Sequence, residues 1–478
     1  AHQSIGLPQP LKLFGTPEQK KKWLPALAAG KISAFALTEP DVGSDPARLA
    51  TTAKLSADGS HYILNGKKIW CTNGYVADLF VVMAQTDPDP AHPKKKQITA
   101  FVLDRGAPGF EIPYRSHFMG LAGIQNAVLE FKDVKVPKEN ILWGPGRGLR
   151  LALATLNAGS LSIPAVSIGA GRSCLIEART WGNERSQWGK PVGRHEAGQK
   201  KLADIAARLH AMESITFLAS HWVDRDSHDI RLEAAMSKLY CSESAYHVID
   251  ETLQFKGGRG YEKADSLKGR GERPFPAERL LRDGRINLII EGTSEILRLY
   301  LAREALDRHL KLAGQLFNPK ASLLQKLATL VRAGVFYARW YPWQWLGQWF
   351  CFSAKDFTLG VLGRHLRYAR RTSHRLARMT FHLMLRHGPG LEKQQLQLFR
   401  VVDIATELFV MSASVARAQA LKSSGHPESM AVAHHYCQMA RLRIEELFNS
   451  TRHNCDASAR TVANSVLDGK LGWLEKTL

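Results

Sequence analysis

Cysteine is scarce in this chain, and long apolar runs are missing from it. The 478 residues include six cysteines, and no two of them are separated by only two residues. The sequence therefore lacks the main signal of a zinc ribbon or a thioredoxin-like site, and the scattered cysteines indicate free thiols in a reducing compartment. No run approaches the ~18 apolar residues of a membrane-spanning helix, so no such helix is predicted.

Acidic residues are also few in comparison with basic residues. The chain has 44 acidic and 65 basic residues, which gives a formal net charge of +21. This excess favours an anionic partner such as nucleic acid, an acidic membrane surface or a phosphorylated ligand, and the charge does not choose among them. The hydrophobic fraction of 45% and the charged fraction of 23% are ordinary for a globular protein. They exclude a disordered chain, a collagen and a coiled-coil rod.

The hydrophobic pattern changes along the chain and predicts an α+β fold. Asn65-Gly66, which lies between apolar residues, indicates a hairpin turn in a β-rich part. Long amphipathic stretches at about 149–182, 196–224, 230–256 and 290–311 predict helices and together indicate a helical bundle. The predicted segments are a helical segment at 1–32, a central β-domain at 33–143, a helical bundle domain at 144–312 and a helical extension at 313–478.

Four short motifs follow one another within this framework. They read AFALTEPDVGSD at 34–45, KIWCTNG at 68–74, GGRGY at 257–261 and IEGTSEIL at 290–297. In this order they resemble the acyl-CoA dehydrogenases, a family of flavin enzymes, over about residues 1–312. The resemblance implies FAD as the cofactor and the α,β-dehydrogenation of a fatty acyl-CoA to trans-2-enoyl-CoA in fatty acid β-oxidation. It also implies that residues 1–32 are the remnant of a longer N-terminal helical domain.

Glu291, inside the last motif, is the expected catalytic base. Ile289 and Ile290 offer an apolar setting, in which the pKa of a carboxyl group rises towards the range that suits removal of an α-proton from a thioester. The resemblance places the family's base at this glutamate and directs its backbone N–H at the thioester oxygen. Taken alone, Glu291 would be better explained as an ordinary glutamate at a helix N-terminus, where the dipole favours it. The four motifs together favour the catalytic role.

The resemblance also implies cofactor and substrate contacts. The residues expected to touch FAD are Phe35, Leu37, Thr38, Ser44, Trp70, Cys71, Thr72, Arg185, Trp188, Gln254, Gly257, Gly258, Thr293 and Glu295. The residues expected to touch the substrate are Ser44, Asn157, Ser160 and Gly292. Arg185 suits a diphosphate because its guanidinium group is bidentate. Strand propensity alone would account for Thr38 and Thr72, and core packing for Trp70.

The family's arrangement also implies partners. Its flavin sites are shared across a dimer, so a homodimer or a dimer of dimers is expected, with an electron-transferring flavoprotein as the electron acceptor. Ser160 stands where the family often has an arginine. His434, His435 and Cys437 lack further ligands and are not interpreted as a metal site. The resemblance implies a cytoplasmic location with peripheral contact at the inner membrane in a bacterium, or a mitochondrial location in a eukaryote.

The extension at 313–478 resembles, in position and length, the C-terminal domain of the very-long-chain branch of the family. Residues 336–352 include nine aromatic side chains, and residues 357–391 include seven arginines and no acidic residue. Aromatic side chains prefer the membrane interface and arginines attract acidic lipid, so peripheral membrane contact is expected through residues 336–386. The alternative is an aromatic core between helices with the arginines on a solvated face.

The sequence is compatible with two other functions. An acyl-CoA oxidase would use the same base and pass the electrons to oxygen. A non-catalytic, FAD-containing relative could bind nucleic acid or a membrane through the basic extension, and the intact motif around Glu291 argues against nucleic acid.

Overall fold

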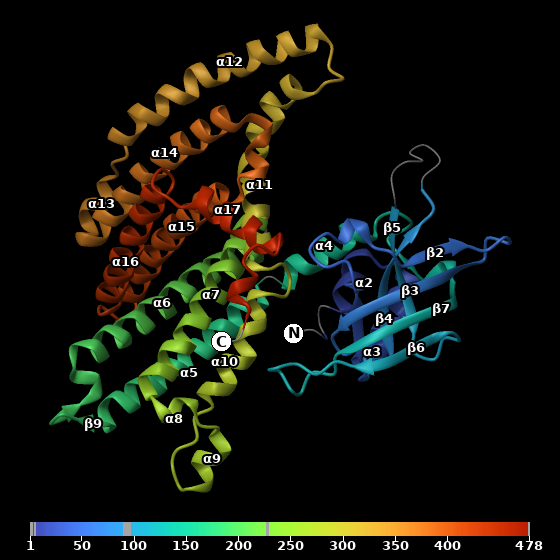
Figure 1. The fold of residues 1–478 in the computed structure, drawn as a ribbon, viewed down its shortest axis with the longest axis horizontal. Helices are drawn as coiled ribbons and strands as arrows, with labels where there is room; N and C mark the ends of the chain where they lie inside the picture. Colours follow the sequence, from blue (N-terminus) through green and yellow to red (C-terminus); the bar gives the residue numbers. More distant parts are fainter. Residues whose placement is uncertain (1–2, 4–5, 89–96, 160, 226–228, 477–478) are drawn as a thin grey trace. The chain divides into compact units, whose positions relative to one another are not determined.

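The computed structural model describes the chain except residues 1–2, 4–5, 89–96, 160, 226–228 and 477–478 (Figure 1). Ser160, one of the predicted substrate contacts, therefore lies outside the described residues. Contacts divide the chain into two compact units. The first holds Ala1–Trp181 with Cys241–Thr293, and the second holds Gly182–Tyr240 with Ser294–Leu478. The predicted α+β fold is confirmed, whereas the four-part domain division remains a prediction.

A mixed sheet of eight strands, counted over the described residues, forms the centre of the first unit. Its hydrogen-bonded order is β6-β7-β3-β2-β4-β5-β8, and β1 pairs in parallel with β4. The strands are β1 (Ser33–Ala36), β2 (Thr52–Leu55), β3 (His61–Cys71), β4 (Leu79–Thr86), β5 (Gln97–Asp104), β6 (Phe110–Arg115), β7 (Ala127–Pro137) and β8 (Ile141–Leu142).

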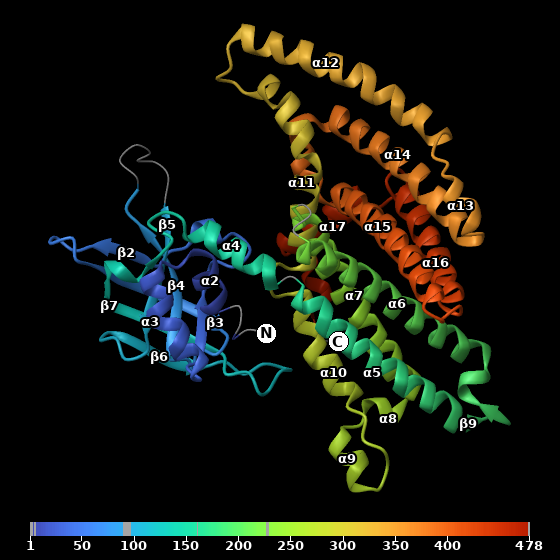
Figure 2. The ribbon, with the colours of Figure 1, turned by 180° about the vertical axis from the view of Figure 1, so that it is seen from behind.

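Both faces of β4 are buried along residues 79–84, because these form a continuous apolar run. Phe80 and its alternate neighbours pack into a cluster with Phe101 and Phe131. Val81 and its alternate neighbours face a second cluster that contains Leu11 and Trp23. Those two residues come from α2 (Pro8–Phe14) and α3 (Pro17–Ala28), which cover that face of the sheet (Figure 2).

The predicted turn at Asn65-Gly66 is wrong, because these residues lie inside β3. The register with β7 shifts between Leu64 and Gly66, which marks a bulge. Asn65 exchanges two hydrogen bonds of 2.9 Å with Asp133 of β7. A Cβ at Gly66 would lie 2.6 Å from Thr51 Oγ1. Glycine is therefore required by close packing and a positive φ.

The rest of the first unit is helical. Its elements are α4 (Gly148–Gly159), α8 (Gly258–Tyr261), α9 (Ala264–Gly269), α10 (Ala277–Arg285) and parts of α5 (Ser162–Glu184) and α7 (Arg231–Lys256). The loop before β7 contacts α10: Leu121 N donates to Asp283 Oδ1 at 2.5 Å, and Arg282 donates to the Met119 carbonyl at 2.9 Å. Gly120 lies between them, where a Cβ would come within 2.5 Å of the Arg282 backbone.

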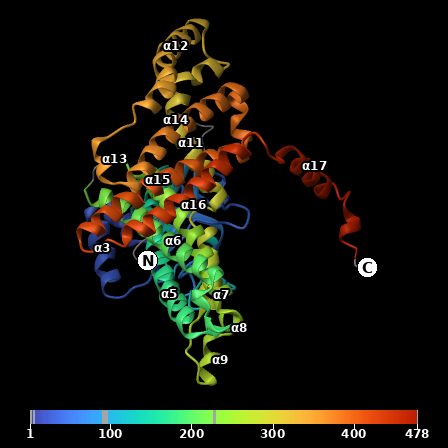
Figure 3. The same ribbon diagram turned by 90° about the vertical axis from the view of Figure 1, so that its left-hand side faces the viewer.

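The second unit is a helical bundle arranged around α15. This helix packs against α6, α11, α14 and α16 (Figure 3). The helices are α6 (Glu196–Asp224), α11 (Ser294–Ala313), α12 (Leu323–Leu346), α13 (Ala354–Thr358), α14 (Val361–His387), α15 (Gln395–Ser423), α16 (Ser429–Ser450) and α17 (Asp456–Leu467). Charged pairs join α15 to its neighbours: Arg298 to Asp403 at 2.8 Å and Arg417 to Glu213 at 2.7 Å.

A pair of histidines within this bundle predicts pH-dependent stability. His365 on α14 is 3% exposed, and its Nε2 lies 2.9 Å from Nδ1 of His434 on α16. Burial, followed by the nearby His434, lowers the pKa of His365 to about 4. The unfolded chain, with a histidine pKa of about 6.5, therefore takes up the proton first as the pH falls. We expect a loss of roughly 2 kcal/mol of unfolding free energy between about pH 7 and pH 5.

Urea unfolding at the two pH values tests this prediction. His365→Gln should remove most of the difference in urea midpoint, whereas the same change at the exposed His426 should preserve it. A pH difference that is equally large in the His365 variant would show that other groups cause it.

Candidate functional site

A buried lysine joins the first two motifs. Lys68 on β3 is fully buried, and its Nζ donates to the Leu37 carbonyl at 3.1 Å and to Glu39 Oε1 at 2.7 Å. The backbone N–H of Ile69 donates to the Thr38 carbonyl at 2.9 Å. These bonds hold the segment after β1 alongside the end of β3.

Lys68 and Glu39 each stabilise the charged form of the other. Burial lowers the pKa of Lys68 to about 8, although Glu39 acts to raise it. Burial alone would raise the pKa of Glu39, but attraction to Lys68 and hydrogen bonds from Thr51 and Ala50 lower it. The pair is therefore ionised at neutral pH and fixes the backbone around it. Sequence reasoning missed Lys68 and Glu39. The signal was available, because strand alternation places Lys68 on the same face as Tyr62 and Leu64.

The predicted flavin contacts around this pair form an accessible surface. Trp70 has 59% of its surface exposed and a φ of +53°, a left-handed conformation that is strained for a bulky residue. Thr38 and Thr72 are half-buried, as are Phe35 and Leu37. Thr72 Oγ1 accepts from Asn126 Nδ2 at 3.4 Å. Asn126 Oδ1 is buried without a hydrogen-bond partner in the described part of the chain.

This arrangement fits an aromatic, hydrogen-bonding cofactor such as a flavin. It offers an exposed tryptophan ring, two accessible threonines and an unsatisfied amide oxygen. Cys71 differs from these residues, because it is buried and burial raises the pKa of its thiol to about 12. It can contribute only through its backbone.

Glu291 lies in a tight turn between the 3₁₀ segment Ile286–Leu288 and α11. Its φ is +54°, and that of Gly292 is +89°. Two successive left-handed residues reverse the chain here, and strained backbone of this kind concentrates at functional sites. Ile289 and Ile290 beside it are exposed. The ordinary explanation, a glutamate in the first helical turn, fits Glu295 instead, because α11 begins at Ser294.

The remaining predicted residues fall into two groups. Gln254, Gly257 and Gly258 are exposed around the end of α7, and Ser44 is exposed in the loop after β1. Thr293 is half-buried after the Glu291 turn. Asn157 lies in α4, and its side chain is outside the described part. These residues belong to the first unit, as do the two motifs joined by Lys68.

Arg185, Trp188 and Glu295 belong to the second unit. Arg185 and Trp188 are at a small hairpin formed by β9 (Ser186–Gln187) and β10 (Lys190–Pro191). Trp188 is 88% exposed and has a φ of +48°. Its ring meets His195 edge to face at 5.9 Å. A tryptophan held in this way on a surface hairpin is accessible for contact with another molecule.

The aromatic segment at 336–352 has features of both an aromatic core and a membrane-contacting surface. The rings of Tyr337 and Trp340 pack at tilted angles against Phe381 of α14, with centroids 4.8 and 5.7 Å away, as the core interpretation requires. Trp349 and Phe350 are exposed, as the membrane interpretation requires. Within the described residues, no helix combines the length and the apolar character needed to cross a membrane.

Comparisons with known proteins cover most of the chain. Acyl-CoA dehydrogenase family models match at residues 1–31 (N-terminal domain), 34–134 (middle domain) and 146–306 (C-terminal domain), and the ACAD9/ACADV C-terminal domain matches residues 366–470. The probable acyl-CoA dehydrogenase FadE10 of Mycobacterium tuberculosis is 50% identical, over 100% of this chain and 73% of its own length. The human mitochondrial very long-chain specific acyl-CoA dehydrogenase is 35% identical, over 93% of this chain and 67% of its own length.

Solved structures agree with these matches. An acyl-CoA dehydrogenase from Bacillus anthracis, complexed with FAD, has a TM-score of 0.75 and 29% identity, over 97% of this chain and 76% of that one. Butyryl-CoA dehydrogenase from Megasphaera elsdenii has a TM-score of 0.58 and 33% identity, over 64% of this chain and 76% of that one.

Proposed function

This chain belongs to the acyl-CoA dehydrogenase family, and from that membership we propose that it oxidises a long-chain fatty acyl-CoA to the trans-2-enoyl-CoA with FAD as its cofactor. The observation that carries the proposal is the conformation of Glu291, which is held in a left-handed turn between apolar residues and the start of α11. The long chain is proposed because the extension matches the ACAD9/ACADV C-terminal domain.

A bound FAD would supply the acceptor for the hydride that leaves Cβ of the acyl chain. The residues proposed to hold it in the first unit are Trp70, through its exposed ring, and Thr38 and Thr72, through their hydroxyls. The Lys68–Glu39 pair positions both segments without being exposed itself. Asn126 fixes the Thr72 side chain.

Glu291 is proposed to act on the other hydrogen. Its carboxylate takes the α-proton, and the electron pair of that C–H bond becomes part of the Cα–Cβ double bond. Negative charge develops on the thioester oxygen as the proton leaves, and the backbone N–H of Glu291 is proposed to donate to it. Ile289 and Ile290 are exposed in the structure and offer an apolar surface beside Glu291 that a bound acyl chain can cover. Exclusion of water by that contact would favour proton transfer near neutral pH.

Anaerobic mixing of the FAD-loaded chain with palmitoyl-CoA tests this function. We expect the oxidised flavin band to bleach and hexadec-2-enoyl-CoA to form. The matched control is S-hexadecyl-CoA, a thioether with the same chain and no carbonyl, which should bind without bleaching. If neither palmitoyl-CoA nor butyryl-CoA bleaches the flavin, the proposal is wrong.

An electron-transferring flavoprotein is the proposed acceptor and a homodimer the proposed assembly. The dimer is supported by the exposure of Arg185, Trp188 and Gln254, which would be accessible to a second copy. Light scattering should give about twice the chain mass of 53.2 kDa, or four times for a dimer of dimers. Rapid reoxidation of the bleached flavin by air, with release of peroxide, would instead identify an oxidase.

Peripheral membrane contact is proposed for the exposed aromatic residues after α12. Trp349, Phe350 and Phe352 are exposed, and Arg371 lies 5.6 Å from the centre of the Phe352 ring. Aromatic and arginine side chains together suit an acidic lipid interface. We expect Trp349→Ser with Phe350→Ser to reduce flotation with anionic vesicles. Unchanged flotation would favour the aromatic-core interpretation.

A further inference from the structure

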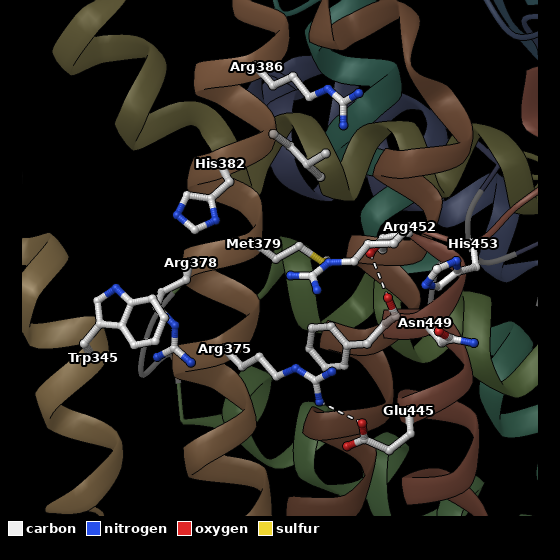
Figure 4. Close-up of a pocket in the computed structure, with 13 residues that line it drawn as sticks. Trp345, Arg375, Arg378, Met379, His382, Arg386, Glu445, Asn449, Arg452 and His453 are labelled. Carbon is white, nitrogen blue, oxygen red and sulfur yellow. Dashed lines mark hydrogen bonds and ion pairs between the residues drawn. The ribbon is translucent and has the colours of Figure 1, made fainter.

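The second unit contains a cavity of about 700 Å³ that the proposed reaction does not use. It lies between α14 and α16, with Trp345 of α12 at one side (Figure 4). Arg375, Arg378 and Arg386 enter it from α14, and Arg452 enters it from just beyond α16. Glu445 is the single carboxylate among the described residues that line it, so the cavity carries an excess of three positive charges.

Two of these arginines are fixed by the protein. Arg378 is 8% exposed, donates to the Gln344 carbonyl and lies over the Trp345 ring at 4.2 Å. Its pKa is lowered by burial, and the nearby Arg375 lowers it further. Arg375 pairs with Glu445 at 2.7 Å and lies over the Phe448 ring at 3.8 Å. Both arginines are therefore already engaged by the protein along the wall of the cavity, and Arg378 keeps its positive charge there.

The other two arginines are available to bind an anionic ligand. Arg386 and Arg452 are exposed, and in the described part of the chain neither forms an ion pair with a carboxylate. Figure 4 shows Arg386 on α14 at the top of the view and Arg452 reaching in from the right. Two such guanidinium groups suit a ligand with several anionic oxygens, because each can form a bidentate pair.

We propose that this cavity binds a phosphorylated ligand, with its phosphate groups on Arg386 and Arg452 and an apolar or ring portion against Trp345 and Met379. The volume is several times that of one phosphate group and lies within the usual range for organic ligands. The lining is both cationic and apolar, as such a ligand requires. A free phosphorylated metabolite and a phospholipid headgroup share this chemistry.

The test uses the full FAD-loaded chain and two probes. Titration calorimetry measures the binding of inorganic pyrophosphate, and flotation measures binding to phosphatidylcholine vesicles with or without phosphatidylglycerol. We expect Arg386→Gln with Arg452→Gln to weaken binding of at least one probe by roughly tenfold or more. The control is Arg332→Gln with Arg460→Gln, which removes two charges from exposed positions outside the cavity and outside residues 336–386, and it should change binding little.

The outcomes distinguish a free phosphorylated ligand from a phospholipid headgroup. Loss of pyrophosphate binding with unchanged flotation assigns a free phosphorylated ligand, and loss of flotation without any pyrophosphate binding assigns a lipid headgroup. No binding of either probe by the unaltered chain, or an equal loss in the control variant, overturns the proposal. Melting temperature and flavin content report whether the variants fold. Arg452→Gln alone carries the same test if the double variant melts lower.

Discussion

Replacing Glu291 with glutamine should slow the bleaching of the flavin by palmitoyl-CoA by roughly 10²–10⁴-fold. Glutamine has almost the same shape as glutamate and cannot accept a proton. The α-proton then has no base in reach, while the turn at Gly292 remains as it is. Flavin absorbance should show that FAD is retained. Stopped-flow absorbance under anaerobic conditions measures the rate.

Two variants make this result specific. Glu291→Asp keeps a carboxylate but shortens it by one methylene, so it should retain part of the rate. Glu139→Gln changes an exposed glutamate of the first unit and should leave the rate unaltered. Near-normal bleaching in Glu291→Gln would remove Glu291 from the catalytic role and leave its strained conformation unexplained.

Replacing Lys68 with methionine should destabilise the protein by about 3–5 kcal/mol, the usual cost of leaving one member of a buried ion pair alone. Lys68 and Glu39 are 0% and 3% exposed, so the remaining carboxylate would be buried without its counter-ion. The Leu37 carbonyl would lose its donor as well. We expect a lower urea midpoint and a lower flavin content, because the segment that carries Thr38 is no longer held against β3.

The matched controls separate burial from charge. Lys132→Met breaks the exposed ion pair with Glu111 and a longer contact of 3.5 Å with Glu130, which keeps Lys67 as its partner. The change should cost less than about 1 kcal/mol. Lys68→Met combined with Glu39→Leu removes both charges and should recover part of the loss. An effect of Lys68→Met as small as that of Lys132→Met would contradict the structural role given to the pair.

Local sequence signals predicted the helical elements well. The amphipathic stretch at 196–224 is α6, with the same bounds. The stretch at 290–311 was expected to be helical from its start, yet α11 begins at Ser294. The helix begins later because Glu291 and Gly292 have left-handed conformations, which helical periodicity does not reveal. The departure from the helical pattern thus coincides with the proposed catalytic residue.

Long-range pairing was harder to anticipate. Asn65-Gly66 has the composition of a hairpin turn, but the partner that decides its conformation is Asp133, 68 residues away. The proximity of Lys68 to Glu39 likewise depends on how β1 and β3 meet, which spacing does not reveal. The motif resemblance placed both segments at one site without indicating the ion pair that holds them together.

The bonds between α6 and the last helices of the bundle have a consequence for biosynthesis. Glu213 pairs with Arg417, and Asp204 with His435, across separations of 204 and 231 residues. A ribosome therefore completes α6 long before its partners exist, and the apolar face of α6 stays exposed while they are made. Folding of the second unit must wait for nearly the whole chain, which makes it slow and exposed to aggregation. Any truncation that removes α15 and α16 leaves α6 without its core.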